Sequence, residues 1–406
     1  MTDNRLYWIW LQQALEPGGV KTALILSSFA SPEAVHAASR SELMRAGFTG
    51  ALLARLCRKS LDPAARILED SLKDGAFVLT MEDEAYPDCL RNTYMPPLVL
   101  YGKGMLPPLD RLPAVAMVGT RRASDYGCRA AGSIAAGLAA GGCVVISGGA
   151  VGIDGASHRG ALAGGGLTIA VQGCGLDVDY PKPNRRLREK ILEADGVIVT
   201  EYPPGSPPLR EHFPVRNRLL AGMAMAVCVV EAPEHSGSLI TARLARNQGR
   251  DVYVVPGDIT SGSSSGSNDL IKDGAALITK ASDILRDYGP RFPEILDLRA
   301  ADAAQAAYRY GGTAKPAPSG HKSPSPSPAR GKEEPAPAPA FSPCPAGISG
   351  KAVLLYGMLT PEPLAAEVLA QKAGLALSDA LAGLTELEIV GCARNFPGRQ
   401  FALRPL

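Results

Sequence analysis

The sequence predicts an α/β fold in which a mainly parallel sheet forms the largest domain, between a small helical domain and a C-terminal winged helix. Three observations support this prediction. Short β-branched runs alternate with helical patterns from about residue 76 to residue 290. The pattern before residue 76 is helical, and a proline-rich stretch separates the last segment from the rest. A chain of 406 residues is too long for one small core, so several domains are expected.

Composition limits the classes of function. The 42 Lys and Arg residues nearly balance the 40 Asp and Glu residues, so an anionic partner must be bound by a local cluster of cations. The eight cysteines include no C-x-x-C pair, which indicates free thiols in a reducing cytosol rather than zinc or redox motifs. The N-terminal segment lacks a signal-peptide cleavage site. The longest uncharged stretch, residues 130–153, is too rich in glycine for a membrane span, and we expect a cytoplasmic protein.

Residues 1–75 are predicted to form the helical domain. They contain paired short helices separated by glycine turns, such as "SRSELMRAGFTGALLARL". This pattern is typical of helix-hairpin-helix units, which contact nucleic-acid backbones, and also of a plain helical bundle. Basic and acidic residues nearly balance in this region, which favours the bundle.

Residues 76–290 are predicted to contain the sheet. Apolar runs of strand length alternate with amphipathic segments such as "RRLREKILEA", and this rhythm is typical of a mainly parallel sheet with helices on both faces. Ligands of such sheets bind at the carboxyl ends of the strands. The predicted strands are "AVAMVG", "CVVIS", "LTIAVQG", "GVIVTE", "AVCVVEA" and "DVYVVPG".

Residues 291–346 are predicted to be a linker, because residues 311–346 contain ten of the 34 prolines. The final residues, 347–406, read as helix, turn, helix and two short strands around a Pro-Gly turn, which is a winged-helix pattern. Its second helix carries Asp379 and Glu386 but no cation. A helix that reads DNA must tolerate phosphates, so this domain is expected to contact a protein partner.

A glycine-rich turn, "SGGAVGID", joins a predicted strand to a predicted helix. It departs from G-x-G-x-x-G, and the next strand ends in Gln172 where a dinucleotide fold needs an acid. NAD binding is therefore disfavoured, and the chain contains no P-loop motif. Backbone N–H groups of such a turn can bind an anion, although a tight turn without a ligand is the simpler alternative. The candidate residues are Ser147, Gly148, Gly149 and Gly152.

Cations follow three separate strands at the same predicted edge. Arginine donates two hydrogen bonds to a phosphate at once, and three such groups around a glycine turn indicate a track for several phosphates. One alone would be an ordinary solvated side chain. The first group is Gly119, Thr120, Arg121 and Arg122, the second is Lys182 with Asn184, and the third is Arg216, Asn217 and Arg218.

Catalytic interpretations are weaker. Asp154 and His158 share a helix face, but two ligands are too few for a metal, and a helix cap with a structural histidine explains them better. Glu201 and Glu231 each end a strand, where a carboxylate could act as a general acid or brace a nearby arginine; we favour bracing. No catalytic residue, metal or cofactor is assigned.

Several stretches, in this order, together resemble the DNA-processing protein A (DprA/Smf) family of bacteria. They are "VAMVGTRRASDYG", "ISGGAVGIDGASHRGAL", "TIAVQGCGLDVDYPKPNRRL", "TEYPPGSPPLREHFPVRNRLLAG", "VVEAPEHSGSLITARLARNQGRDVYVVPG" and "GSNDLIKDGA".

This resemblance covers about residues 80–290. It implies an extended Rossmann-like fold that binds single-stranded DNA, protects incoming strands during natural transformation and loads RecA on them. The helical domain is similar to the sterile-alpha-motif-like extension of some members, and the winged helix resembles the one that many members carry. By this resemblance, the family's DNA pocket corresponds here to Arg121, Lys182 and the turn of Gly148 and Gly149, and also to Arg216 and Arg218.

The resemblance also implies a homodimer. Family members dimerise through the end of the sheet domain, which places Leu270, Ile271 and Leu277 at the interface. Taken alone, the stretch that contains them is equally an ordinary amphipathic helix. The residues that would contact RecA are not assigned.

Two other functions are weighed. Nucleotide phosphoribohydrolases of a related Rossmann-like fold carry P-G-G-x-G-T-x-x-E, whereas "VPGDITSGSS" lacks the second glycine and the acid. A transcription factor acting through the winged helix is disfavoured by the acidic residues of its second helix.

Overall fold

The computed structural model describes residues 3–19, 21–93, 95–309, 349–360, 364–390, 392–396 and 400–403. The chain divides into two compact units, Met1–Gly320 and His321–Leu406. Most of the predicted linker and the predicted Pro397-Gly398 turn lie outside the described residues.

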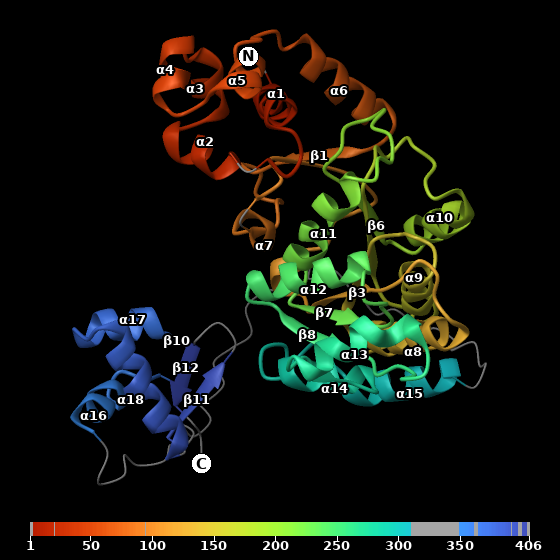
Figure 1. The fold of residues 1–406 in the computed structure, drawn as a ribbon, viewed down its shortest axis with the longest axis vertical. Helices are drawn as coiled ribbons and strands as arrows, with labels where there is room; N and C mark the ends of the chain where they lie inside the picture. Colours follow the sequence, from red (N-terminus) through yellow and green to blue (C-terminus); the bar gives the residue numbers. More distant parts are fainter. Residues whose placement is uncertain are drawn as a thin grey trace, which may run out of the picture. The chain divides into compact units, whose positions relative to one another are not determined.

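A nine-stranded sheet runs through the first unit (Figure 1), in the order β1-β2-β6-β5-β4-β3-β7-β8-β9. The seven strands from β3 to β9 pair in parallel, while β1 and β2 form an antiparallel pair that joins the sheet where β2 meets β6. The strands are β1 (Phe77–Thr80), β2 (Val99–Lys103), β3 (Ala114–Val118), β4 (Val144–Ser147), β5 (Thr168–Gln172), β6 (Val197–Thr200), β7 (Ala226–Val229), β8 (Asp251–Val254) and β9 (Ala276–Leu277).

The order of the strands reverses beside β3. Along the chain, β3 to β6 are laid down in one direction, and the chain then returns to place β7 on the other side of β3. A reversal of this kind opens a crevice at the carboxyl ends of the strands, which is where ligands of open parallel sheets bind. The fold therefore places the end of β3, with its arginine pair, at the crevice.

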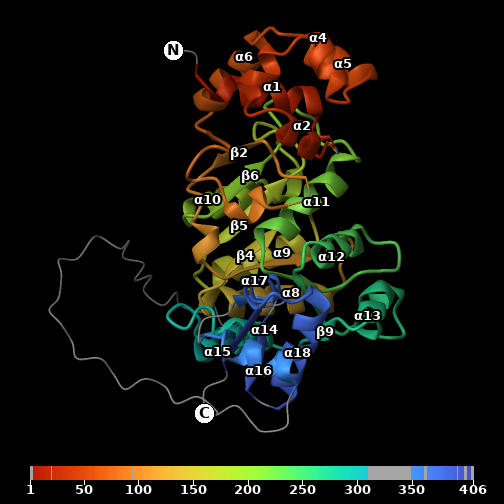
Figure 2. The same cartoon turned by 90° about the vertical axis from the view of Figure 1, so that its left-hand side faces the viewer.

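Helices cover both faces of the sheet (Figure 2), and each face has its own apolar core. One core combines the sheet with α11 and α12, and the other combines it with α8, α9, α14 and α15. The helices of this part are α7 (Asp88–Arg91), α8 (Asp125–Ala140), α9 (Ile153–Ala163), α10 (Arg185–Glu193), α11 (His212–Met223), α12 (Gly237–Asn247), α13 (Ser265–Lys272), α14 (Ala281–Tyr288) and α15 (Leu298–Arg309), with short 3₁₀ turns η1 (Leu109–Arg111), η2 (Lys182–Asn184) and η3 (Gly262–Ser264).

The linker prediction is wrong for residues 291–309. Phe292 and Ala301 are buried in the core under α8, and α15 packs along that helix. The packing is close because α8 presents glycines; a Cβ on Gly137 would lie 2.9 Å from the carbonyl oxygen of Ala301. Ala301 on α15 faces both Gly137 and the next glycine, Gly141, and proline content does not reveal such a contact between small residues. The ordered unit thus extends past the sheet by one more helix.

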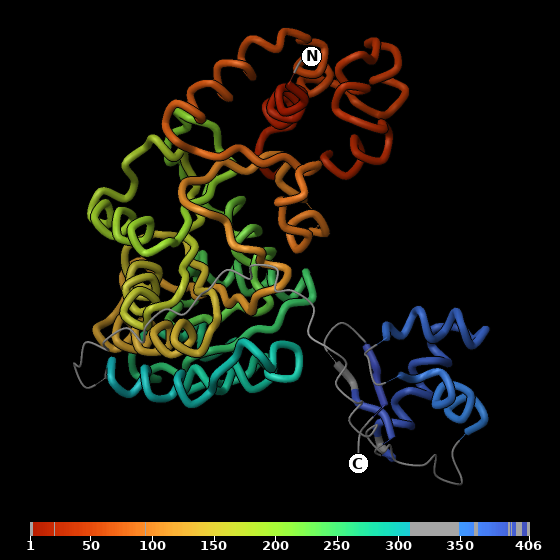
Figure 3. The backbone as a smooth tube through the Cα atoms, turned by 180° about the vertical axis from the view of Figure 1, so that it is seen from behind, coloured from red at the N-terminus to blue at the C-terminus, as the bar shows by residue number. Residues whose placement is uncertain are grey.

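The N-terminal helices confirm the predicted helical character of residues 1–75, but they do not have a core of their own. Trp8 and Leu11 share one apolar cluster with Val99 and Tyr101 of β2. The side chain of Gln12 also binds the sheet, donating to the carbonyl oxygen of Glu201 and accepting from the amide of Val99. These helices lie at the end of the unit opposite α14 and α15 (Figure 3). They are α1 (Arg5–Leu15), α2 (Thr22–Ser28), α3 (Pro32–Ala37), α4 (Arg40–Arg45), α5 (Gly50–Leu56) and α6 (Asp62–Lys73).

The second unit has the predicted helix–turn–helix and two strands. A further helix precedes them, and a short third strand completes a three-stranded sheet of order β10-β12-β11. Leu369, Leu384 and Phe401 meet in its core. The elements are α16 (Gly350–Tyr356), β10 (Leu364–Ala365), α17 (Ala366–Ala373), α18 (Leu377–Ile389), β11 (Ala393–Phe396) and β12 (Gln400–Leu403).

Candidate nucleic-acid interface

A cavity of about 1000 Å³ opens at the crevice between β3 and β7, with residues of α11 and α12 in its wall. Three other cavities of the first unit are smaller, at about 400 to 440 Å³. It is lined by Val118, Gly119, Thr120, Arg121, Arg122, Ala150, Asp154, Tyr180, Pro208, Arg210, Phe213, Pro214, Arg216, Asn217, Leu220, Pro233, His235, Ser236, Gly237, Ser238, Ile240 and Thr241.

Two backbone hydrogen bonds hold the turn that follows β3, residues 119–122, which we call the arginine turn. The amide of Thr120 donates to the carbonyl oxygen of Glu231 at 2.7 Å, and its own carbonyl oxygen accepts from the amide of Ile153 at 3.2 Å. The turn is therefore fixed both to the end of β7 and to the start of α9. The next residues, Arg121 and Arg122, are exposed and line the cavity. Their guanidinium groups therefore extend from a backbone that is held in place by hydrogen bonds of Thr120.

Gly152 is required by this arrangement. It has φ +80°, and a Cβ at this position would lie 2.4 Å from the carbonyl oxygen of Thr120. A side chain here would therefore push the arginine turn away from α9 as well as strain the backbone. The glycine-rich turn supports the arginine turn, although only Ala150 and Asp154 of this stretch line the cavity.

Aromatic side chains, which the sequence analysis did not assign to the site, complete the exposed wall. The guanidinium carbon of Arg121 lies 4.5 Å from the ring centroid of Phe213, and that ring lies 5.6 Å from the ring of Tyr180. Arg210 and His235 also line the cavity. The available signal was the position of Phe213 three residues before the predicted Arg216, and of Tyr180 two residues before Lys182. A low total content of aromatic residues concealed this local pair.

Arg216 forms part of the cavity floor rather than its exposed wall. Its side chain is buried, and Nη1 donates to the carbonyl oxygens of Gly148, at 2.7 Å, and of Val171. A Cβ on Gly148 would lie 2.5 Å from this guanidinium, so glycine is the residue that leaves room for it. Burial lowers the pKa of Arg216.

Asp154 lies in the same floor. Burial raises the pKa of its carboxyl group, and the nearby Arg216 partly opposes that rise. Its Oδ2 accepts from the amide of Ala150 at 3.3 Å. Asp154 therefore braces the glycine turn and is not the predicted helix cap, because it lies within α9 and the N-cap of that helix is Gly152.

Four other predicted residues are held inside the protein. The prediction is wrong for Arg218, because it is 3% exposed and forms an ion pair with Glu201 at 2.7 Å. Ser147 is fully buried and donates to the carbonyl oxygen of Met117. Asn184 donates to the carbonyl oxygens at positions 149 and 150, and so braces the glycine turn from behind. Asn217 lines the cavity but donates its amide to the carbonyl oxygen at position 237.

Lys182 is exposed on η2 but is not among the residues that line the cavity. Its neighbour Tyr180 does line it. Lys182 is therefore two residues away in the chain from the cavity wall, and its contact with a ligand stays a prediction.

The two strand-end glutamates brace the fold. Glu201 pairs with Arg218, as the bracing interpretation expects. Glu231 accepts instead from the amide and hydroxyl of Ser124, at 2.9 and 3.0 Å, and Ser124 caps α8. Glu231 is fully buried and does not line the cavity. It thus anchors the residue that comes two positions after the arginine pair.

The predicted self-association residues lie near the β9 edge of the sheet. Leu277 is 51% exposed on β9, the edge strand. Leu270 and Ile271 on α13 are partly buried against the protein's own core, which leaves them less apolar surface for a partner. A dimer at this edge stays a prediction.

Among the residues that the structure describes, no helix combines the length and the apolar character of a membrane span, and no three His, Cys, Asp or Glu side chains are grouped so that they could hold a metal ion.

Comparison with known proteins defines the family. The family described as DNA recombination-mediator protein A matches residues 77–289, and the DprA winged helix domain matches residues 332–399. The chain belongs to the DprA/Smf family. The putative DprA of Mycobacterium tuberculosis strain H37Rv is 38% identical over 296 residues, which cover 70% of this chain and 74% of that protein.

DprA of Streptococcus pneumoniae is 46% identical over 206 residues, covering 51% of this chain and 72% of that protein. Its X-ray structure aligns with a TM-score of 0.60 at 36% identity, over 68% of this chain and 97% of that chain. The matched sheet domain of this chain contains the arginine turn, the glycine turn and the cavity that they border.

Proposed function

We propose that this member of the DprA/Smf family binds single-stranded DNA in the cavity between β3 and β7 and acts as a recombination mediator. The observation that carries the proposal is the pairing of Arg121 with Phe213, 4.5 Å apart on the cavity wall. Exposed guanidinium groups bind phosphates, and an aromatic face stacks on a base. Both kinds of contact side by side suit a strand whose bases are unpaired.

The rest of the wall supports the same ligand. Arg122 and Arg210 add two exposed cations, while the buried charge of Arg216 adds positive potential from below. The cations contact a backbone that is the same for every sequence, so little sequence preference is expected. Lys182 and the amides of the glycine turn are proposed to contact further phosphates of the same strand.

The biological role that we propose follows from the family. The protein would work in the cytoplasm as a homodimer, protect single strands that enter during natural transformation and transfer them to RecA. The edge that contains Leu277 would form the dimer, and the winged helix would bind a protein partner. None of these steps requires catalysis by the chain.

A mobility-shift experiment tests the proposal. Single- and double-stranded oligonucleotides of equal length are compared, with and without RecA. We expect tighter binding of the single strand and faster formation of RecA filaments on strands that carry this protein. Equal affinity for the duplex, or no binding at all, would refute the proposal.

The competing hydrolase function has little support at this site. The stretch nearest to the phosphoribohydrolase signature, Pro256 to Ser264, has Asp258 in place of the second glycine and Ser264 in place of the acid. Glu231 cannot replace it, because this carboxylate is fully buried and binds Ser124. Release of free base from a nucleoside monophosphate, lost in Glu231→Gln, would revive the hydrolase hypothesis.

A further inference from the structure

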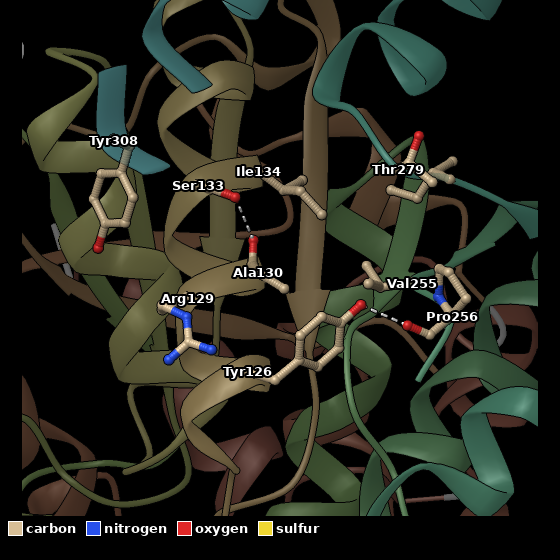
Figure 4. Close-up of a pocket in the computed structure, with 10 residues that line it drawn as sticks. Tyr126, Arg129, Ala130, Ser133, Ile134, Val255, Pro256, Thr279 and Tyr308 are labelled. Atoms are coloured by element: carbon tan, nitrogen blue, oxygen red, sulfur yellow. Dashed lines mark hydrogen bonds between the residues drawn. The ribbon is translucent and has the colours of Figure 1, made fainter. Parts of the chain in front are cut away.

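A second cavity, of about 400 Å³, lies beside α8 (Figure 4). Its wall contains two tyrosines and one arginine, and apolar residues form its base. Its volume is within the range of small-molecule sites. The lining residues are Tyr126, Arg129, Ala130, Ser133, Ile134, Val255, Pro256, Ile278, Thr279 and Tyr308.

The two tyrosines are fixed in place by the fold. The hydroxyl of Tyr126 donates to the carbonyl oxygen of Pro256 at 2.6 Å, and the side chain remains 44% exposed. Tyr308 reaches the cavity from α15, and its ring packs so closely on α8 that a Cβ on Gly132 would lie 2.6 Å from the ring carbon Cζ. Both rings are thus positioned before any ligand arrives.

Arg129 lies between these rings in the close-up (Figure 4). Its side chain is exposed, and no hydrogen bond or ion pair ties it to the other described residues. A guanidinium without a carboxylate partner beside two aromatic faces has the composition of a stacking site with a phosphate contact.

This cavity continues from the arginine turn. The helix α8 begins three residues after Arg122, and Tyr126 lies in its first turn. A third hollow, of about 440 Å³, is lined by Ser124, Tyr126 and Pro256, and it shares the last two residues with the cavity of Arg129. The residues Tyr126 to Ser133 then extend the path by about 10 Å along the helix. A strand that leaves the arginine turn therefore meets this surface next.

We propose that the cavity of Tyr126, Arg129 and Tyr308 is a second DNA subsite, which takes one unstacked base of the strand that crosses the arginine turn, with the flanking phosphate on Arg129. The inference deepens the proposed function and rests on it. Asp258 lines the intermediate hollow but not the cavity of Arg129, so the phosphate is placed on the arginine side, away from that carboxylate.

The full-length chain tests this subsite through the length dependence of binding. Oligo-dT strands of increasing length are titrated by fluorescence anisotropy against wild type, Arg129→Gln and Arg129→Lys. Arg299→Gln on α15 is the matched control, because Arg299 is exposed but lies outside the cavity. Short strands should bind Arg129→Gln as well as wild type. Longer strands should bind it on the order of tenfold more weakly, with a log–log salt slope shallower by about 0.7.

Cross-linking gives an independent measurement. A 5-iodo-deoxyuridine placed along the longer strand should cross-link to peptides that contain Tyr126 or Tyr308 at one group of positions and to the Phe213 peptide at another. Equal affinities of Arg129→Gln and wild type at all lengths, or cross-links confined to Phe213, would overturn the subsite. Either result would leave the proposed DNA site in the cavity between β3 and β7 unaffected. Failure of wild type to bind any strand would contradict the proposed function itself.

Discussion

Arg121 and Arg216 line the same cavity, yet their surroundings give them different tasks. Arg121 is exposed above the ring of Phe213, so its donors are available to a phosphate. Arg216 uses Nη1 to hold the carbonyl oxygens of Gly148 and Val171. Arg216 therefore holds the backbone at the base of the cavity in place and adds positive charge below the exposed wall. Sequence motifs alone treat the two residues as equivalent, because burial is decided by the packing of α11.

Phe213 should contribute to affinity without contributing to the salt dependence. In Phe213→Leu the cavity keeps an apolar side chain but loses the flat face on which a base stacks, so single-strand affinity should fall about tenfold. The log–log salt slope should equal that of wild type, because no phosphate contact is removed. Anisotropy titrations at several salt concentrations measure both quantities. An unchanged affinity would show that the ring does not stack on a base.

At the scale of elements, the start of α9 sets the position of the arginine turn. Gly152→Ala should destabilise the protein by about 1–3 kcal/mol, because the new Cβ meets the carbonyl oxygen of Thr120 and the backbone has φ +80°. It should also weaken DNA binding, since the displaced turn contains Arg121. Gly262→Ala is the control, as nothing lies within 4 Å of its Cβ position. Urea unfolding that gives equal stabilities for the two variants would contradict this reasoning.

His158 links α9 to β5 and should make stability depend on pH. Thr168 Oγ1 donates to the carbonyl oxygen of Val145 at 2.7 Å, so it accepts from His158 Nδ1, also at 2.7 Å. The buried Nε2 then has no partner among the described atoms, and burial lowers the pKa of His158 to about 3. The unfolded chain takes up this proton near pH 6.5, whereas the folded chain does not.

Stability that depends on neutral His158 is therefore fully present above about pH 6.5 and is lost as the pH falls toward 3. The loss should be about 1.4 kcal/mol per pH unit in this window. Urea unfolding between pH 7 and pH 5 measures it, with His158→Gln as the comparison. If the variant has the same slope as wild type, His158 is not the group that titrates.

The sequence predicted the six central strands because each is a short β-branched run that ends at a turn. It could not predict β9, which has two residues, nor the pairing of β2 with β6, which depends on contacts distant in sequence. It also placed the arginine and glycine turns at one edge, since parallel strands share their carboxyl ends. It could not predict that Arg218 on α11 is buried, because this depends on an ion pair with Glu201, which directly follows β6.

At the scale of the whole molecule, all the residues that line the cavity between β3 and β7 belong to the first unit. Deletion of residues 311–406 should therefore leave single-strand affinity within about twofold of wild type, since no proposed phosphate or base contact is removed. Anisotropy with the same oligonucleotide measures this. A large loss would instead assign DNA binding to the winged helix, as a transcription factor would require.

The most direct measurement is the salt dependence of single-strand binding by wild type and Arg121→Ala. If Arg121 neutralises a phosphate, its removal should weaken binding to all sequences about equally and reduce the log–log slope by about 0.7. The turn itself should remain in place, because it is held through backbone atoms of Thr120. An unchanged slope in a correctly folded variant would mean that no DNA backbone passes the end of β3.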